Sequence, residues 1–297
     1  MIIVSLTFLI SLGISLGTYF ILYYPNPGLI WTIFLSTPVY FIVIIVLYLV
    51  FVAFFGSVYK AMNLPDKEKP NRFGMFILEQ TAFIFIRLFN GHPHFSGWGK
   101  LPHLNQRFCL VSNHLSGFDH LGLVSILAGR RMICVSKRQN EDIFVAGGWL
   151  KYAGYLFIDQ KDILQGQEVI AKGAKLIEDG VCSVAIAPEG TRNKDFPEPL
   201  MLPFKPGSFQ LAVAAKAPIV VIAIQNTNAL LQRFPRFTNL YFDCVAVLEY
   251  DDYKDMSLNE ISTYCYDRIM ERFEKKQSRF YHLKKKEKEE KKEDAKK

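Results

Sequence analysis

The first 59 residues contain no aspartate, glutamate, lysine, arginine or histidine, and the first charged side chain is Lys60. A water-soluble domain does not present so long a segment without charged groups at its surface. Half of the 297 residues are hydrophobic and 21% are charged, which excludes intrinsic disorder for most of the chain. The absence of charge therefore indicates a membrane segment, and the rest of the chain is long enough for one sizeable domain.

Two apolar stretches, residues 2–24 and 29–55, occupy this charge-free segment. Each exceeds the roughly 20 residues that a helix needs to cross a bilayer, and the Pro and Gly residues between them favour an antiparallel hairpin. Gly13 and Gly17 form a GxxxG pair, which allows two helices to approach closely. A cleavable signal peptide is the alternative, but the first stretch lacks the basic residues that open such a peptide.

Basic residues follow the second apolar stretch closely, namely Lys60, Lys67, Lys69 and Arg72. By the positive-inside rule they place both ends of the hairpin, and the domain after it, on the cytoplasmic face of the membrane. A hairpin that lies in one leaflet without crossing is the alternative, because Pro38 interrupts the second stretch. Residues 75–90 form a further apolar stretch, too short to span, for which core packing or a membrane-contacting face is expected.

The sequence has only five cysteines and no CxxC pair, so nothing in it indicates a zinc site or a disulfide framework. Reduced, buried thiols in a reducing compartment are the simplest interpretation. The net charge of +7 includes +3 from the Lys/Glu-rich residues 284–297, and no basic stripe interleaved with aromatics is present. Nucleic acid is therefore not an expected partner, and a basic surface near anionic lipid fits better.

Downstream of the hairpin, short β-rich runs alternate with helical patterns. The predicted strands are residues 108–112, 132–136, 155–158, 182–187, 219–224 and 241–248, and the predicted helices include residues 162–179 and one that begins at Ser257. This alternation favours an α/β fold with a mixed sheet flanked by helices. The expected organisation is a two-helix membrane hairpin over residues 1–59, a cytoplasmic domain over 60–283 and a charged tail over 284–297.

The motif NHLSGFDH, residues 113–120, follows a predicted strand and precedes a predicted helix. A bend between the two can bring the carboxylate of Asp119 onto the imidazole of His114. Such a pair is suited to general-base catalysis, because the neutral imidazole accepts a proton and the carboxylate stabilises the imidazolium. A structural histidine that caps the helix is the alternative. His120 invites a metal interpretation, but no second ligand cluster is present, so no metal is expected.

The motif PEGTR, residues 188–192, follows another predicted strand. The guanidinium of Arg192 can bind a phosphate through two parallel hydrogen bonds, which suits an anionic headgroup. Lys205 stands just before a helical start, where free amides also favour anions. For either residue, an ordinary turn with a solvated cation is the alternative.

Four segments of this chain, in this order, resemble the four blocks of the glycerolipid acyltransferase family: NHLSGFDH, GYLFIDQ at residues 154–160, PEGTR, and APIVVIAI at residues 217–224. The resemblance covers about residues 75–250, and its first and third blocks are the most specific. It implies transfer of a fatty acyl group from a thioester to the free hydroxyl of lysophosphatidic acid, which gives phosphatidic acid.

The resemblance also assigns roles to nine residues. It implies that His114 and Asp119 form the catalytic pair, and that the acceptor is held by Glu189, Gly190, Thr191, Arg192, Lys137, Lys161 and Lys205. It implies no cofactor, and acyl-CoA or acyl-carrier protein as the donor. Because the sequence contains no Gly-x-Ser-x-Gly elbow, direct attack by the acceptor hydroxyl on the thioester is the simplest route.

Two positions depart from the family pattern. Gln160 stands where an arginine is common, so either Lys161 supplies the charge from a shifted position or the acceptor differs, and Val221 stands where a second proline is common. The same chemistry on another lysophospholipid, on glycerol 3-phosphate or on a lyso-aminolipid is therefore an alternative. A catalytically silent, membrane-tethered lipid-binding protein is another, but the complete first and third blocks count against it.

Overall fold

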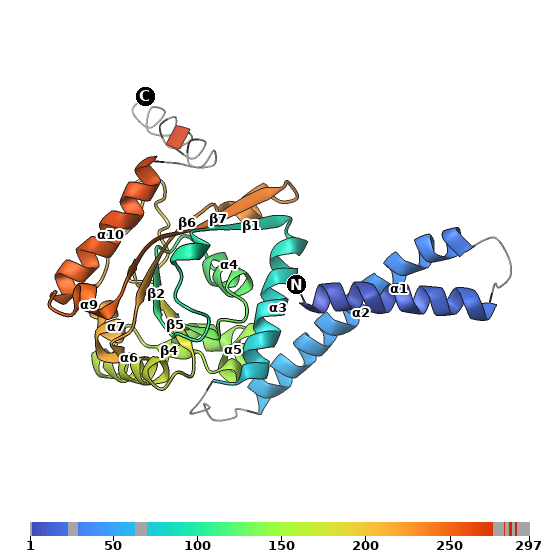
Figure 1. The fold of residues 1–297 in the computed structure, drawn as a ribbon, viewed down its shortest axis with the longest axis horizontal. Helices are drawn as coiled ribbons and strands as arrows, with labels where there is room; N and C mark the ends of the chain where they lie inside the picture. Colours follow the sequence, from blue (N-terminus) through green and yellow to red (C-terminus); the bar gives the residue numbers. More distant parts are fainter. Residues whose placement is uncertain are drawn as a thin grey trace. The chain divides into compact units, whose positions relative to one another are not determined.

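The computed structural model describes residues 2–22, 29–62 and 70–275, together with positions 282, 285, 286 and 289 (Figure 1). It divides into two compact units, Met1–Pro65 with Ile143–Trp149, and Asp66–Asp142 with Leu150–Lys297. Three predicted features lie outside the described residues: the Pro/Gly turn at 25–28, the basic residues Lys67 and Lys69, and most of the tail at 284–297.

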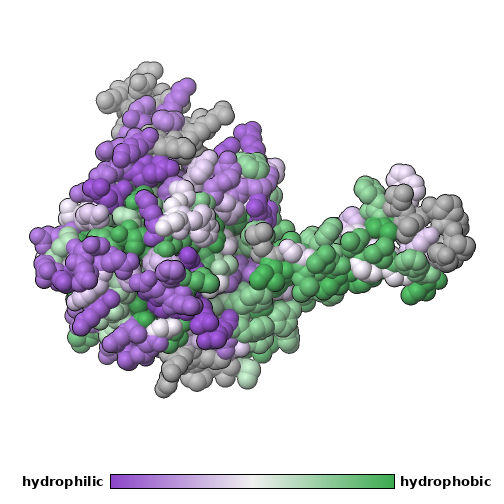
Figure 2. Space-filling view, viewed as in Figure 1, coloured by the Kyte–Doolittle hydropathy of each residue, from purple (hydrophilic) through white to green (hydrophobic). Residues whose placement is uncertain are grey.

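The first unit contains the two predicted apolar helices, α1 (Ile2–Leu22) and α2 (Leu29–Ala61). They pack through polar contacts as well as apolar ones, because Thr37 Oγ1 donates to Ser15 Oγ at 3.0 Å. Space around Gly13 and Gly17 is open, so the GxxxG pair does not mediate a close approach of α1 to α2. Residues 2–21 and 33–61 are long and apolar enough to cross a membrane by length and composition, and Figure 2 shows mainly hydrophobic side chains along both helices.

Residues Ile143–Trp149, far along the sequence, pack against α2 within this first unit. The indole N–H of Trp149 donates to the Val52 carbonyl at 2.7 Å, and the indole stacks on Phe55 with ring centroids 4.6 Å apart. At Gly56 a Cβ would lie 2.6 Å from the Val145 carbonyl oxygen, so only glycine permits this close approach. The sequence did not predict this contribution to the first unit.

The second unit contains a mixed sheet of seven strands in the order β1-β7-β6-β2-β5-β3-β4. Their bounds are β1 Gly91–Ser96, β2 Cys109–Ser112, β3 Met132–Lys137, β4 Leu156–Ile158, β5 Ser183–Ile186, β6 Ile219–Gln225 and β7 Thr238–Leu248. Neighbouring strands run parallel except for β6 and β7, which are antiparallel. This confirms the predicted α/β fold with a mixed sheet.

The interior strands are uniformly apolar because helices cover both faces of the sheet. All residues of β2, β5 and β6 are buried. The helices α3 (Arg72–Leu88) and α4 (Phe118–Ile126) contact one side of the sheet, and α6 (Ile163–Glu178), α7 (Gln210–Ala215) and α10 (Leu258–Lys275) the other (Figure 1). Shorter helices are α5 (Ala146–Ala153), α8 (Ala229–Arg233) and α9 (Tyr250–Tyr253), with 3₁₀ turns η1 (Trp98–Lys100), η2 (Arg138–Asp142) and η3 (Pro206–Phe209).

Capping residues next to the helix ends determine where several of these helices begin and end. The Asp162 side chain accepts the Gln165 N–H at the start of α6, and Gly180 just past its end has φ +69°. Before α10, Ser257 and Glu260 form the reciprocal bonds of a capping box, which agrees with the helix start predicted at Ser257. Strand β1 was not predicted, because its sequence GHPHFS contains Gly and Pro; as an edge strand bonded only to β7, it tolerates Pro93.

Candidate active site

The predicted site residues lie in loops at one edge of the sheet. Strands β2, β3, β5 and β6 are parallel, so their carboxyl ends meet at the same edge. The loops that leave β2 and β5 there contain the motifs at residues 113–120 and 188–192, and Lys137 is the last residue of β3. This is where open α/β sheets place ligands.

His114 and Asp119 are in direct contact. His114 Nδ1 lies 2.7 Å from Asp119 Oδ2, and the two side chains are 14% and 2% exposed. Asp119 lies in the first turn of α4, and the bend after β2 turns its carboxylate back onto the imidazole. With Nδ1 bonded to the carboxylate, His114 retains Nε2 to accept a proton.

The Asp119 carboxylate accepts three further hydrogen bonds. Oδ2 takes the backbone N–H groups of Leu115 and Ser116 at 2.7 and 2.9 Å, and Oδ1 accepts the hydroxyl of the fully buried Thr227. These bonds fix the carboxylate in the orientation that faces His114. Sequence reasoning missed Thr227, and the available signal was its place two residues past the carboxyl end of β6.

Asn113 anchors the start of this loop to the sheet. Its amide Nδ2 donates to the Ile224 carbonyl at 3.0 Å, and its Oδ1 accepts the Ile224 N–H at 2.7 Å. The side chain is completely buried, so both bonds are shielded from water. Asn113 thus fixes the backbone immediately before His114, a role that the motif alone did not reveal.

The loop after β5 holds the His114 backbone from both sides. Glu189 Oε1 accepts the His114 N–H at 2.7 Å, Glu189 Oε2 accepts the Leu202 N–H at 3.0 Å, and the Asn193 N–H donates to the His114 carbonyl at 2.8 Å. Burial raises the pKa of Glu189 to about 7, although its two amide donors and nearby His114 lower it. Both Glu189 oxygens are therefore engaged with backbone, and its predicted contact with the acceptor stays a prediction.

Three predicted cations form a basic cluster beside this loop: Lys137, Arg192 and Lys205. Burial lowers the pKa of Lys137, as do the charges of Arg192, Lys205 and Lys194. The Lys137 ammonium donates to Thr191 Oγ1 at 3.3 Å, so the third block reaches the end of β3. Mutually repelling cations at the mouth of a loop favour an anionic ligand.

Gly190 is required by the geometry of this cluster. Its φ is +70°, and a Cβ there would lie 2.9 Å from the ammonium nitrogen of Lys205. A larger residue would strain the backbone and displace Lys205. Of the predicted acceptor residues, the structure thus groups Lys137, Gly190, Thr191, Arg192 and Lys205.

Comparison with known proteins agrees with the family resemblance of the sequence motifs. Residues 92–225 match the family model described as Acyltransferase, a range that contains every predicted site residue. Residues 92–225, which are less than half of the chain, are thus similar to acyltransferases. A 1-acyl-sn-glycerol-3-phosphate acyltransferase alpha of Homo sapiens is 37% identical over 126 residues, which are 41% of this chain and 42% of that protein.

Two bacterial proteins extend the comparison. A 1-acyl-sn-glycerol-3-phosphate acyltransferase of Haemophilus influenzae is 25% identical over 169 residues, or 56% of this chain and 68% of that one. The crystal structure of the 1-acyl-sn-glycerophosphate (LPA) acyltransferase PlsC from Thermotoga maritima has a TM-score of 0.55 and 18% identity, and covers 68% of this chain and 78% of that chain. The likeness to the Thermotoga maritima structure shows that the two chains share a fold. Against the mammalian relatives the chain spans about two fifths of their length, 42% for the human protein.

Gln160 departs from the family pattern, and it differs in its contacts from Lys161, the residue that could supply the missing charge. The Gln160 amide Nε2 donates to the Gly190 carbonyl, which ties the second block to the third. The Lys161 side chain is exposed, and its backbone N–H donates to Asp159 Oδ1 at 3.0 Å. The structure therefore brings Gln160, rather than Lys161, into contact with the loop that carries Arg192.

His120 lies close to His114, with their ring centroids 5.5 Å apart. Burial, and to a smaller extent the neighbouring His114, lower the pKa of His120 to about 4, so the ring is neutral at physiological pH. Within residues 2–22, 29–62 and 70–275, no group of three or more His, Cys, Asp or Glu side chains could hold a metal ion.

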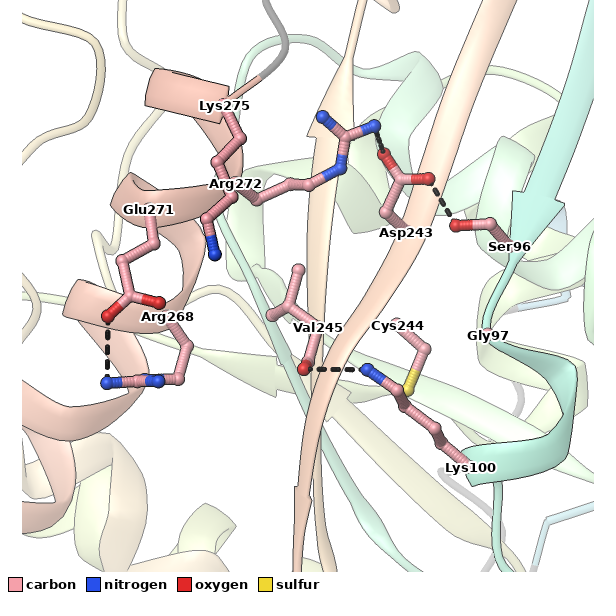
Figure 3. Close-up of a pocket in the computed structure, with 10 residues that line it drawn as sticks. All are labelled: Ser96, Gly97, Lys100, Asp243, Cys244, Val245, Arg268, Glu271, Arg272 and Lys275. Carbon is pink, nitrogen blue, oxygen red and sulfur yellow. Dashed lines mark hydrogen bonds and ion pairs between the residues drawn. The ribbon is translucent and has the colours of Figure 1, made fainter.

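A pocket of about 450 Å³ lies elsewhere in the second unit, between α10, β7 and η1 (Figure 3). Arg272 reaches from α10 to Asp243 Oδ2 at 2.6 Å, and the Lys100 ammonium donates to the Val245 carbonyl at 3.1 Å. The lining residues are Ser96, Gly97, Lys100, Asp243, Cys244, Val245, Arg268, Glu271, Arg272 and Lys275. None of the nine predicted site residues is among them, so this pocket is separate from the candidate active site.

Proposed function

We propose that this protein transfers a fatty acyl group from a thioester donor to the free hydroxyl of lysophosphatidic acid, which gives phosphatidic acid. The observation that carries the proposal is the 2.7 Å contact of His114 Nδ1 with the buried Asp119 carboxylate, beside a cluster of three cations. Relatives named for this reaction and the family match over residues 92–225 support it. The donor is acyl-CoA or acyl-carrier protein.

His114 acts as the general base in this proposal. Its Nε2 takes the proton of the acceptor hydroxyl as the oxygen attacks the thioester carbonyl, and Asp119 stabilises the imidazolium that forms. The carbon–sulfur bond then breaks, and the thiolate leaving group takes the proton from the imidazolium. Oxygen acylation, thiol release and proton return thus balance without a covalent acyl-enzyme.

The acceptor phosphate binds the basic cluster of Lys137, Arg192 and Lys205. A planar guanidinium offers two parallel donors to a phosphate, and the ammonium groups add charge without a fixed geometry. Repulsion among the three cations is relieved when a phosphate binds, which favours a phosphorylated acceptor over a neutral one. Glu189 acts by holding the backbone of His114, and Gly190 keeps room for Lys205.

The apolar helices α1 and α2 tether the enzyme to the membrane that contains its acceptor and product. Their length and composition support this role, and Lys60 in the last turn of α2, together with Arg72, supports a cytoplasmic position of the acyltransferase domain by the positive-inside rule.

Acyl transfer by the purified full chain in detergent tests the proposal directly. We expect conversion of lysophosphatidic acid to phosphatidic acid with acyl-CoA or acyl-carrier protein as donor, and none with His114→Ala. Monoacylglycerol, which differs from this acceptor by the missing phosphate, serves as the matched control. Absence of product with both donors, or equal rates on both acceptors, would contradict the proposed reaction and the proposed phosphate site respectively.

A further inference from the structure

Five large apolar side chains stand exposed at the edge of the sheet that carries the candidate active site. They are Phe85, Leu88, Leu231, Phe234 and Phe237, each between 39% and 55% exposed, and are called the aromatic patch below. They come from the end of α3 and from α8 with the segment that joins it to β7, two parts of the second unit that are in contact through Phe89 and Phe234 (α3 and β7 are labelled in Figure 1). Contiguous exposed apolar groups of this size mark an interaction surface.

Ring contacts join the two parts of the aromatic patch. Phe89 at the end of α3 lies 5.6 Å from Phe234 and 5.0 Å from Phe85, measured between ring centroids. Phe237 stacks on His92 of β1 at 3.8 Å. The patch is therefore one surface rather than a scatter of separate side chains.

The aromatic patch adjoins the catalytic loop directly. Phe118, the residue before Asp119, lies 6.2 Å from Phe85 and 6.1 Å from Phe89 between ring centroids. On the other side, α8 begins two residues after Thr227, whose hydroxyl donates to Asp119. A partner that covers the patch would thus lie beside the loop that carries His114 and Asp119.

Charge around the aromatic patch has one sign. The stretches of sequence that contain its residues, 80–118 and 199–242, have no aspartate or glutamate, and Arg87, Arg233 and Arg236 stand among its apolar residues. Aromatic side chains flanked by arginines, without acids, suit the headgroup region of an anionic bilayer.

A second exposed apolar pair lies at the same edge of the sheet. Ile163 and Leu164, just after the carboxyl end of β4, are 77% and 73% exposed, and Lys161 stands next to them. Because β4 is at the opposite end of the strand order from β1, the loops that carry His114 and Arg192 leave strands between the two apolar groups. One flat partner could touch both at once.

We propose that the acyltransferase domain docks on an anionic lipid bilayer through the aromatic patch, with Leu231, Phe234 and Phe237 inserted among the headgroups. This surface is distinct from the apolar helices α1 and α2. It would present the candidate active site to the plane of the membrane, so that a lipid acceptor enters without crossing water.

Depth-dependent fluorescence quenching tests this contact in the full chain. The five native cysteines are buried, so a cysteine introduced as Leu231→Cys or Phe237→Cys can be labelled selectively with a bimane probe. The matched control is Lys254→Cys, because Lys254 follows β7 at the opposite edge of the sheet. Each labelled protein is reconstituted in nanodiscs that contain a doxyl-labelled phospholipid, with or without phosphatidylglycerol.

We expect the labels at 231 and 237 to be quenched about twofold or more in anionic nanodiscs, and the label at 254 to remain unquenched. Arg233→Gln with Arg236→Gln should lower the docked population by up to about fivefold for each arginine lost. Equal quenching at all three positions, or none at 231 and 237, would overturn the proposal.

The expected quenching of the labels at 231 and 237 does not require acyl transfer. His114→Ala leaves the aromatic patch intact, so its labels should be quenched as in the active protein even though it transfers no acyl group. If the wild-type enzyme transferred no acyl group but its labels were quenched, only the proposed reaction would be refuted. If the labels at 231 and 237 were not quenched in either protein, only the docking surface would be refuted.

Discussion

Glu189 and His114 are joined by a hydrogen bond from the His114 backbone N–H to Glu189 Oε1, at 2.7 Å. This bond connects the loop after β5 with the loop after β2. The carboxylate therefore acts on the proposed base through its backbone, while the neighbouring Arg192 remains exposed to an acceptor. Two residues only three apart in the sequence thus have different expected effects on the reaction.

Glu189→Gln should lower kcat by about 10-fold or more with little change in the acceptor KM. An amide has one oxygen, so it cannot accept both the His114 and the Leu202 N–H groups, and a lost bond to a charged acceptor is worth about 1.5–3 kcal/mol. Steady-state kinetics with lysophosphatidic acid separate the effect on kcat from the effect on the acceptor KM. A raised acceptor KM with unchanged kcat would instead return Glu189 to the acceptor-holding role implied by the family resemblance.

Burial raises the pKa of Glu189 to about 7, and this predicts a pH-dependent stability. The folded protein holds this proton more tightly than the unfolded chain, so the stabilisation is complete at low pH. It is lost as pH rises from about 4.5 to about 7, by an amount on the order of 3 kcal/mol, and does not change above that. The melting temperature of the wild type, relative to that of Glu189→Gln, should fall across this window. A constant difference would contradict the raised pKa.

The sequence was sufficient to predict the elements that depend on local patterns. Six of the seven strands were expected because continuous apolar runs mark strands buried on both faces, and α6 and α10 were expected from their helical patterns. Strand β1 escaped prediction because Gly91 and Pro93 disfavour strands, and its place depends on pairing with β7, far along the chain. Residues Ile143–Trp149 were missed for the same reason, since only contacts with α2 reveal their position.

The candidate site was likewise predictable where it depends on local sequence patterns and not where it depends on contacts between distant segments. The sequence motifs predicted which residues gather at the carboxyl edge of the sheet, because parallel strands end there. They did not reveal which atoms face each other: Thr227 and Asn113 have no distinctive sequence pattern, and their bonds to Asp119 and Ile224 join segments more than a hundred residues apart. Side chains whose role is to hold another residue are therefore found from contacts.

Removing the proposed base should abolish the reaction without unfolding the protein. His114→Ala is expected to lower kcat by about 10²–10⁴-fold, the usual contribution of a positioned base. Asp119→Asn should be severely impaired too, because the imidazolium loses its charge partner. Circular dichroism and membrane association check the fold of each variant. Near-wild-type turnover in either folded variant would exclude the proposed catalytic pair.

Thr227→Val tests the orientation of Asp119. Valine has nearly the shape of threonine but no hydroxyl, so a buried carboxylate oxygen loses a donor at a cost of about 1–3 kcal/mol. We expect kcat to fall about 10-fold and the acid limb of the pH–rate profile to shift, because Asp119 no longer holds the imidazolium in one orientation. Thr227→Ser retains the hydroxyl and should restore both. If Thr227→Val changed only the melting temperature, its role would be purely structural.

The last prediction concerns Arg192, which is exposed beside Lys137 and Lys205. Arg192→Lys keeps the positive charge but loses the two parallel donors that grip a phosphate, so the acceptor KM should rise about 10-fold while the donor KM stays the same. The matched control is Lys194→Arg, a change of the same kind at a neighbouring exposed cation, which should leave both values unaltered. Monoacylglycerol, which has no phosphate, should be a poor acceptor and should be indifferent to Arg192→Lys, because the interaction that the substitution removes is absent from it. A rise in the donor KM alone would assign Arg192 to the thioester carrier, and the acceptor phosphate would then have to be held by Lys137 and Lys205.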